Sequence, residues 1–205
     1  MKKLFFLFFL LSLFIISAQA QVRLGLKSGL NISSFYGDDT EGLDSKLGFV
    51  GGFFISYQSK NLFILQPEVS YTTKGATAKI ESASFTLSYD YIEIPILFKF
   101  EFPLDDNPGF KPALFAGPFV AFKTKANVIL SVNGETEEES INSVAPRDYG
   151  FQIGGALGYN IGKYELGLDV RYILGITSVD TSVNGFDIKN RVINLNLYFC
   201  FANMK

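Results

Sequence analysis

The chain contains eight stretches in which apolar residues alternate with small or polar ones. In the clearest, one face holds Val22, Leu24, Leu26, Leu30 and Ile32, and the other holds Arg23, Gly25, Lys27, Gly29, Asn31 and Ser33. Because successive side chains of a β-strand point to opposite faces, this stretch is a strand with apolar surroundings on one side only. A transmembrane β-barrel makes that demand, with lipid outside and a polar lumen inside. The expected strands span residues 22–34, 46–58, 62–74, 84–102, 111–131, 148–160, 163–176 and 190–202.

The connections between these strands are alternately short and long. The short ones cover residues 58–61, 103–110 and 160–163, and the long, polar ones cover 35–45, 75–83, 131–147 and 177–189. Outer-membrane barrels have short periplasmic turns and longer extracellular loops. The sequence therefore predicts an all-β fold, an eight-stranded antiparallel up-and-down transmembrane β-barrel with both termini in the periplasm.

The main rival is a soluble eight-stranded barrel with its apolar face inward. The less apolar face of this chain is rich in glycine, at positions 25, 29, 48, 52, 150, 154, 158 and 167. Such a face is a poor solvated surface, whereas an eight-stranded barrel has an interior only just wide enough for side chains. Glycine suits that narrow lumen, and the membrane barrel is favoured.

The fourth stretch changes phase part-way along. Its apolar residues are odd-numbered from Phe85 to Tyr91 and even-numbered from Ile92 to Phe100. A β-bulge near Tyr91 and Ile92 would reset the alternation, and two shorter strands meeting there would do the same. The continuous apolar content beyond the switch favours the bulge.

The first twenty residues have the pattern of a secretory signal peptide. Lys2 and Lys3 precede an apolar run of roughly 13 residues, shorter than the about 20 that a membrane-spanning helix needs. The run ends in small residues up to Ala20, which form a cleavage site. We therefore expect a cleaved signal at 1–20, a barrel domain at 21–205, and a protein integral to the cell outer membrane.

Several motifs resemble an outer-membrane β-barrel family common in Bacteroidetes, often described as porin-like or PorT-like. Residues 91–99, YIEIPILFK, resemble the family's YxEIPxLxK strand, and residues 111–119, KPALFAGPF, its KPY…AGP strand. Residues 148–150 and 171–176 are similar to its later strands. The resemblance implies a barrel fold, and PorT itself is associated with type IX secretion. One departure is the end of the chain, because Phe201 is followed by four residues where barrels usually end on an aromatic one.

The residue types present argue against an enzyme. The chain has no histidine, which removes Ser-His-Asp catalysis and ordinary zinc sites, and it lacks a phosphate-binding glycine motif. The single cysteine, Cys200, forms no intramolecular disulfide and is expected to be a small buried residue on the last strand. A net charge of −2 without a basic cluster gives no surface for nucleic acid. We expect no catalytic residue, no metal and no cofactor.

Charged residues on the inward face are the remaining chemical feature. The sequence predicts a polar network in the lumen formed by Arg23, Lys27, Glu68, Glu93, Lys99, Asp169 and Arg171. Lys46 and Glu101 share that face. Because unpaired charges are costly in a narrow interior, we expect these side chains to pair, and an ion or proton path or a small-ligand site is the alternative. Glu93 and Lys99 stand out as a pair. The acidic segment from Glu135 to Glu139 is expected to be a solvated loop, with a divalent-cation or partner site as the alternative.

These observations favour a structural or interaction role, with a packed lumen and exposed surface loops. A narrow porin-like channel for small solutes and a PorT-like component of a secretion assembly are the alternatives. The expected partners are outer-membrane lipid and, during insertion, the barrel-assembly machinery. A protein partner remains open.

Overall fold

The computed structural model describes residues 21–38, 40–58, 62–80, 83–102, 104, 106–132, 135–141, 143–181 and 187–201. The predicted signal peptide at 1–20 lies outside them. The strands are β1 (Gln21–Gly37), β2 (Leu43–Gln58), β3 (Phe63–Ile80), β4 (Ala83–Glu101), β5 (Phe110–Val132), β6 (Glu135–Ser140), β7 (Arg147–Ile161), β8 (Tyr164–Gly175) and β9 (Ile188–Cys200). No helix in these ranges is long and apolar enough to cross a membrane.

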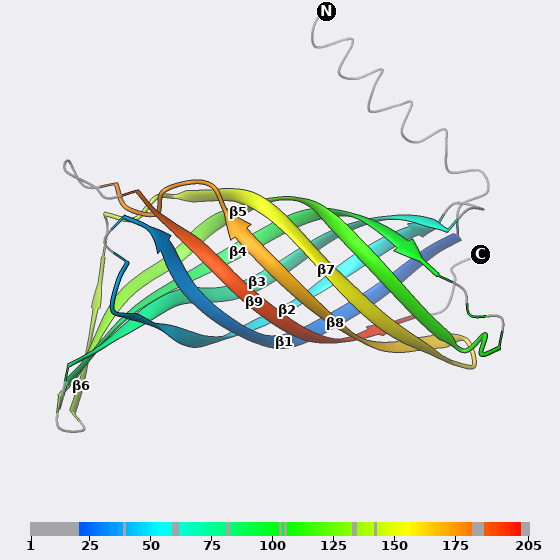
Figure 1. Ribbon diagram of the computed structural model, residues 1–205, viewed down its shortest axis with the longest axis horizontal. Helices are drawn as coiled ribbons and strands as arrows, with labels where there is room; N and C mark the ends of the chain where they lie inside the picture. Colours follow the sequence, from blue (N-terminus) through cyan, green and yellow to red (C-terminus); the bar gives the residue numbers. More distant parts are fainter. Residues whose placement is uncertain are drawn as a thin grey trace, which may run out of the picture.

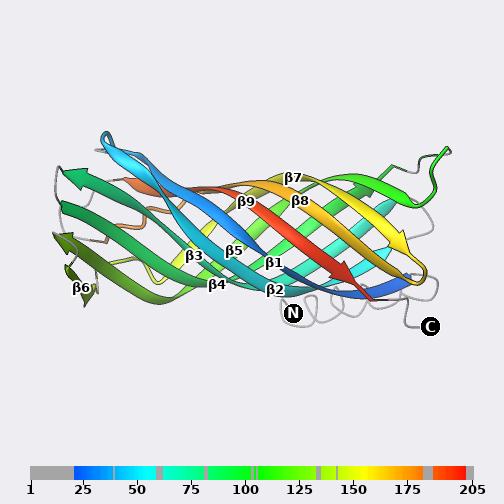
Figure 2. The same cartoon turned by 90° about the horizontal axis from the view of Figure 1, so that it is seen from below.

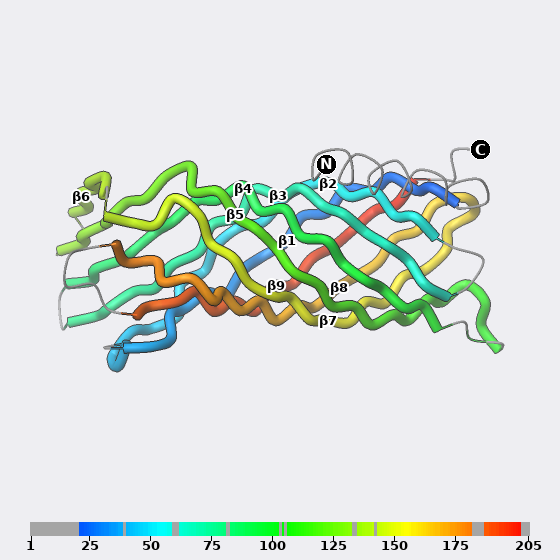
Figure 3. Tube along the Cα trace, turned by 90° about the horizontal axis from the view of Figure 1, so that it is seen from above, coloured from blue at the N-terminus to red at the C-terminus, as the bar shows by residue number. Residues whose placement is uncertain are grey.

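Eight of the strands close into a ring, which confirms the predicted fold. The order is β4-β3-β2-β1-β9-β8-β7-β5, all neighbours pair antiparallel, and β4 pairs with β5 to close it. Figure 1 shows the resulting barrel along its length, and Figure 3 shows its strands tilted to the long axis. The start of β1 and the end of β9 lie at the end with the short connections, which we call the short-turn end.

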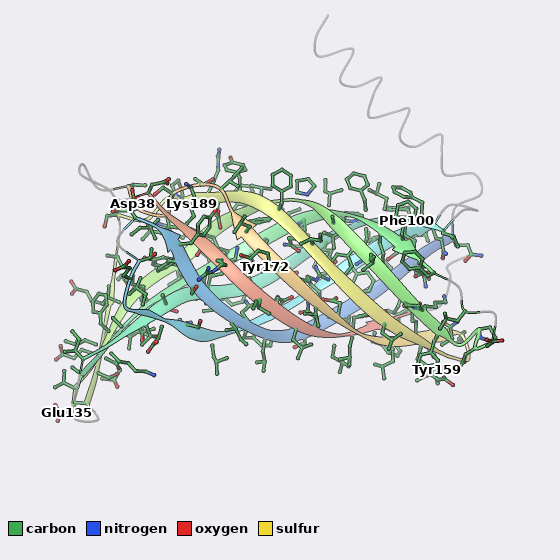
Figure 4. All side chains as sticks on the ribbon, viewed as in Figure 1. Asp38, Phe100, Glu135, Tyr159, Tyr172 and Lys189 are labelled. Carbon is green, nitrogen blue, oxygen red and sulfur yellow. The ribbon has the colours of Figure 1, made fainter. Side chains whose placement is uncertain are left out.

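The outer surface of the barrel is apolar around its circumference. On six of the eight strands, leucine, isoleucine and valine side chains have half or more of their surface exposed: Leu26, Leu30, Leu47, Leu114, Ile153, Leu168, Val170, Leu195 and Leu197. On β4 the exposed outward residues are Ile96, Phe98 and Phe100. Outward aromatic residues gather at the short-turn end, where Phe100 packs on Phe63 and Tyr159 on Phe110. Figure 4 shows Phe100 and Tyr159 near this end. This is the surface that lipid solvates, with amphipathic rings at its border.

The predicted bulge is present at the expected level, but it lies in β5 and not in the fourth strand, because β4 keeps one alternation. Its odd-numbered residues are the buried ones from Tyr89 to its end, so Tyr89 and Tyr91 point inward. A register shift does occur at this level, in the pairing of β4 with β5. Asp90 pairs with Lys125 and Tyr91 with Lys123, which leaves Thr124 of β5 as the extra residue.

The surroundings of the strand reverse along β4, and this explains its change of hydrophobic phase. At the short-turn end the inward residues are polar and the outward ones apolar, as with Lys99 and Phe100. Beyond Tyr91 the inward residues pack in an apolar cluster, and the outward ones are polar, as with Thr86 and Ser88. The phase of the residues is constant while the environment on each side changes.

Two of the expected long loops are largely strand. β3 continues to Ile80 and β4 starts at Ala83, so most of the predicted loop 75–83 belongs to a hairpin. The acidic segment forms β6, which pairs with the end of β5. These extensions stand beyond the barrel at its other end, which we call the long-loop end (Figures 1 and 2).

Candidate functional site

The lumen is the candidate functional site, and it holds ion pairs along most of its length. Eleven charged side chains of the described chain are buried there: Arg23, Lys27, Lys74, Lys99, Arg171, Glu68, Glu93, Glu101, Asp148, Glu165 and Asp169. Each of them lies within 4 Å of an opposite charge. All seven residues of the predicted network are in this set.

At the short-turn end, Arg23 of β1 bridges two carboxylates. It lies 3.1 Å from Glu101 of β4 and 2.6 Å from Glu165 of β8, across the barrel interior. Lys99 lies 3.8 Å from Glu101, and the partly exposed Lys111 lies 3.4 Å from Glu165. The two contacts of Arg23 and the contact of Lys111 with Glu165 join strands that are not neighbours in the ring, so they tie separate walls of the barrel together.

In the middle of the lumen, Arg171 of β8 pairs with two carboxylates through both of its edges. Nε and one terminal nitrogen donate to Asp169 at 2.7 and 2.8 Å, and the terminal nitrogens donate to Glu68 of β3 at 2.8 and 3.1 Å. Lys27 also contacts Glu68. Bidentate guanidinium–carboxylate pairs combine charge with a fixed geometry, so this cluster fixes the position of β8 relative to β3.

Closer to the long-loop end, Lys74 is fully buried among acids and aromatic rings. Its Nζ lies 2.7 Å from Glu93 and 3.5 Å from Asp148. The same ammonium lies 4.6 Å from the ring centre of Phe119 and 5.3 Å from that of Tyr91. The two carboxylates and the ring faces together compensate for the water that this buried cation loses.

Amide side chains link the Arg171 cluster in the middle of the lumen with the Lys74 cluster. Gln152 donates to Glu93 at 2.7 Å and accepts from Arg171 at 3.3 Å. Asn196 donates to Asp169 at 2.7 Å, and Gln66 donates to Glu68 at 2.8 Å. A chain of hydrogen bonds therefore connects the middle of the lumen with the Lys74 cluster.

The long-loop end of the lumen is closed by an apolar cap. Its buried members are Phe35, Ala76, Tyr89, Tyr91, Phe119, Ala121, Ala126, Val144, Ile173, Val179 and Val192. Val144 and Val179 come from connections outside the ring, which cross-link where Ala145 N–H donates to the Val179 carbonyl at 2.9 Å. The chain thus folds its own loops over the barrel mouth.

Inward glycines make room for aromatic rings from neighbouring strands. A methyl group at Gly25 would overlap the ring of Phe54, and one at Gly167 would overlap that of Tyr198. The two rings pack edge to face with centroids 6.1 Å apart, and the Tyr198 hydroxyl donates to Glu165 at 3.0 Å. At these two positions aromatic rings therefore fill the space that the glycines leave in the lumen.

The comparisons with known proteins agree with this geometry. Residues 17–181 match the family described as outer membrane protein beta-barrel domain. The chain belongs to this family. It is therefore a small β-barrel of the outer membrane, from a family that is generally non-enzymatic, and its long-loop end is extracellular and its short-turn end periplasmic.

Solved barrels of similar fold share little sequence with this family member. The outer membrane protein OprG from Pseudomonas aeruginosa aligns with a TM-score of 0.51 at 11% identity, over 91% of this chain and 99% of that one. Neisserial surface protein A aligns with a TM-score of 0.47 at 15% identity, over 85% and 95%. The attachment invasion locus protein Ail of Yersinia pestis aligns with a TM-score of 0.42 at 14% identity, over 89% and 99%. No match was found among curated proteins.

Glu93 and Lys99, which the sequence singles out together, have different ion-pair partners. Glu93 pairs with Lys74 and Lys99 with Glu101. Residues six apart on one strand lie roughly 20 Å from each other, beyond the reach of their side chains. Lys46, also expected inward, is only partly buried at the extracellular end.

Apart from Glu101, which the sequence already places on the inward face, three buried charges of the lumen were not among the predicted network residues. Lys74 has the same parity as Glu68 and ends the predicted third strand, so extending the polar face by one step would have found it. Asp148 and Glu165 lie on the predicted polar faces of their strands and are buried. The alternation of apolar and polar residues along each strand is therefore enough to predict that all three side chains point inward.

The YIEIPILFK motif lines the interior of the barrel. Its alternate residues Tyr91, Glu93, Pro95, Leu97 and Lys99 are all buried and inward. The positions that carry the family resemblance are thus the ones that fill the lumen. The motif describes how the barrel packs, which is independent of any partner outside it.

Proposed function

We propose that the protein is a packed barrel that anchors an extracellular β-sheet and its loops in the outer membrane, and that its role is binding at the cell surface. The observation that carries the proposal is the filled lumen. Every buried charge described there is paired, and the apolar cap covers the extracellular mouth. An eight-stranded barrel leaves room for little besides side chains, so solute passage is disfavoured.

Conductance across a planar bilayer tests this proposal. The purified full-length mature barrel is inserted into the bilayer, with an open porin measured in the same apparatus as a positive control. We expect no steady conductance from the barrel. Reproducible single-channel steps from a preparation whose gel mobility shifts on heating would overturn the proposal and favour the narrow porin-like channel.

A second proposal concerns assembly. Residues 91–99 resemble PorT-like proteins common in Bacteroidetes, and an exposed extracellular sheet supplies a surface for a partner. The barrel would then be a subunit of a secretion complex. Co-purification of the tagged protein from native outer membranes in mild detergent tests this. A stoichiometric partner supports it, and a lone heat-modifiable barrel contradicts it.

A further inference from the structure

The extracellular extensions of four strands form one continuous sheet, which we call the tip sheet (residues 76–80, 83–87, 128–132 and 135–139). The cross-strand rows can be followed residue by residue. One row runs Ala78, Phe85, Leu130, Glu137, and the next runs Ile80, Ala83, Val132, Glu135. In Figures 1 and 2 this sheet stands beyond the barrel, with β6 at its border.

The face of the tip sheet that continues the barrel interior is apolar and uncovered. The bulge at Thr124 shifts β5 by one residue, which places Val128, Leu130 and Val132 on the same face as Phe85. The exposed fractions are 71% for Ile80, 40% for Phe85, and 41% each for Leu130 and Val132. A contiguous exposed apolar patch marks an interaction site, since water solvates it poorly.

The opposite face of the tip sheet is polar, as expected for a surface in water. It carries Thr77 and Thr86, whose hydroxyls lie 3.0 Å apart, and Ser131 and Thr136, at 3.2 Å. Lys79 on this face is exposed. The tip sheet is therefore two-sided, and its apolar side is a distinct surface.

An acidic border adjoins the apolar face. Glu135, Glu137 and Glu139 alternate along β6 on this face, and the whole of β6 is exposed. Glu138 points to the other face and pairs with Lys125 at 2.9 Å. Within the described chain it is the one glutamate of β6 with an ion-pair partner, so the acidic border of the apolar face has its charge available.

We propose that the apolar face of the tip sheet and its acidic border bind a basic, amphipathic polypeptide segment of another protein. Apolar side chains of that segment would cover Phe85, Leu130 and Val132, and its lysines or arginines would meet the glutamates of β6. The proposal deepens the surface-binding role proposed above and rests on it.

Charge complementarity selects this occupant over the others. A second copy of the chain would bring its own glutamates against those of β6, and like charges facing each other across strands are destabilising. An anionic lipid surface is repelled by the same border. A basic segment gains from the charges and the apolar area together, and the open edge of β6 also offers backbone hydrogen bonds to an extended chain.

Peptide binding to the full-length mature barrel in zwitterionic nanodiscs tests the proposal. The probes are a fluorescent 12-residue peptide of alternating lysine and valine and its glutamate–valine counterpart. We expect the basic peptide to bind and the acidic one not to. The triple variant Glu135→Gln/Glu137→Gln/Glu139→Gln should weaken binding by about tenfold or more, since close charge pairs across an interface carry that much affinity.

Two further variants separate this surface from general charge effects. Glu138→Gln removes one acid from the opposite face and should leave binding within about twofold, because rim charges away from the contact matter little. Phe85→Ser/Leu130→Ser should weaken binding, and heat-shifted gel mobility confirms that each variant is folded. Equal binding of both peptides, equal binding to empty nanodiscs, an unaffected triple variant, or dimerisation through the tip sheet in sedimentation would overturn the proposal. A non-conducting barrel that binds neither peptide would contradict this inference and leave the packed barrel intact.

Discussion

Arg171 and Ile173 are two residues apart on the inward face of β8, and they belong to opposite kinds of interior. Arg171 is held by Glu68 and Asp169 in the ionic part of the lumen, whereas Ile173 packs in the apolar cap. On β8 the boundary between the ionic part of the lumen and the apolar cap therefore lies between two successive inward residues. The interior of this barrel is therefore a polar column closed by a small hydrophobic core.

The largest expected effect comes from breaking the ionic part. Arg171→Met leaves Glu68 with Lys27 alone and Asp169 without an ion-pair partner among the described residues. Removing one partner of a buried ion pair costs about 3–5 kcal/mol, because a charge stays buried without compensation. Urea unfolding in lipid vesicles measures the loss. An unchanged unfolding midpoint would mean that the lumen admits water freely.

A smaller effect is expected in the apolar cap two residues further along. Ile173→Val removes one buried methylene and should lower the free energy of unfolding by about 0.5–1.5 kcal/mol. The same urea titration applies, and Ile193→Val on the lipid face of β9 is the matched control. If Ile173→Val lowered the free energy of unfolding as much as Arg171→Met does, the ionic part of the lumen and the apolar cap would not differ in their sensitivity to substitution.

The smallest effect is expected from an ion pair outside the barrel. Lys125 and Glu138 lie 2.9 Å apart at the surface of the tip sheet, where both side chains are exposed. Such pairs contribute less than about 1 kcal/mol, because water and salt screen them. Lys125→Ala should therefore shift the unfolding midpoint little. A shift as large as that of Arg171→Met would place this pair in a buried setting.

The sequence correctly predicts the membrane-spanning part of the barrel, because one rule governs which residues face outward there. Between lipid and a polar lumen, apolar residues face out, and that rule assigns Arg23, Lys27 and Glu68 to the interior, where they are buried. Which charges meet across the lumen depends on strand order, tilt and stagger. The pairing of Arg23 with Glu165, 142 positions away, is set by ring closure and has no local signal.

The rule fails at the extracellular end because the inside of the barrel is apolar there and the outward residues are polar. The rule assigns Tyr89 and Tyr91 to the outer face because they are apolar, but they point inward because the apolar cap replaces the polar lumen there. The strand β6 was missed because four glutamates indicate a loop. Its cross-strand pairing with the end of β5 holds it in place.

The extra residue Thr124 has a consequence for how this protein changes over generations. Three polar residues in a row, Lys123 to Lys125, surround the point where β5 gains one residue against β4. On the membrane side of that point the odd positions of β5 face inward, and on the extracellular side the even positions do. Loss of that single codon would remove the bulge and leave residues 125–132 opposite their present partners in β4, because Lys125 would then follow Lys123 directly. The bulge thus lets β5 hold one residue more than β4 without exchanging its inward and outward faces, so a one-residue change of chain length at this point need disturb neither the barrel below it nor the tip sheet above it.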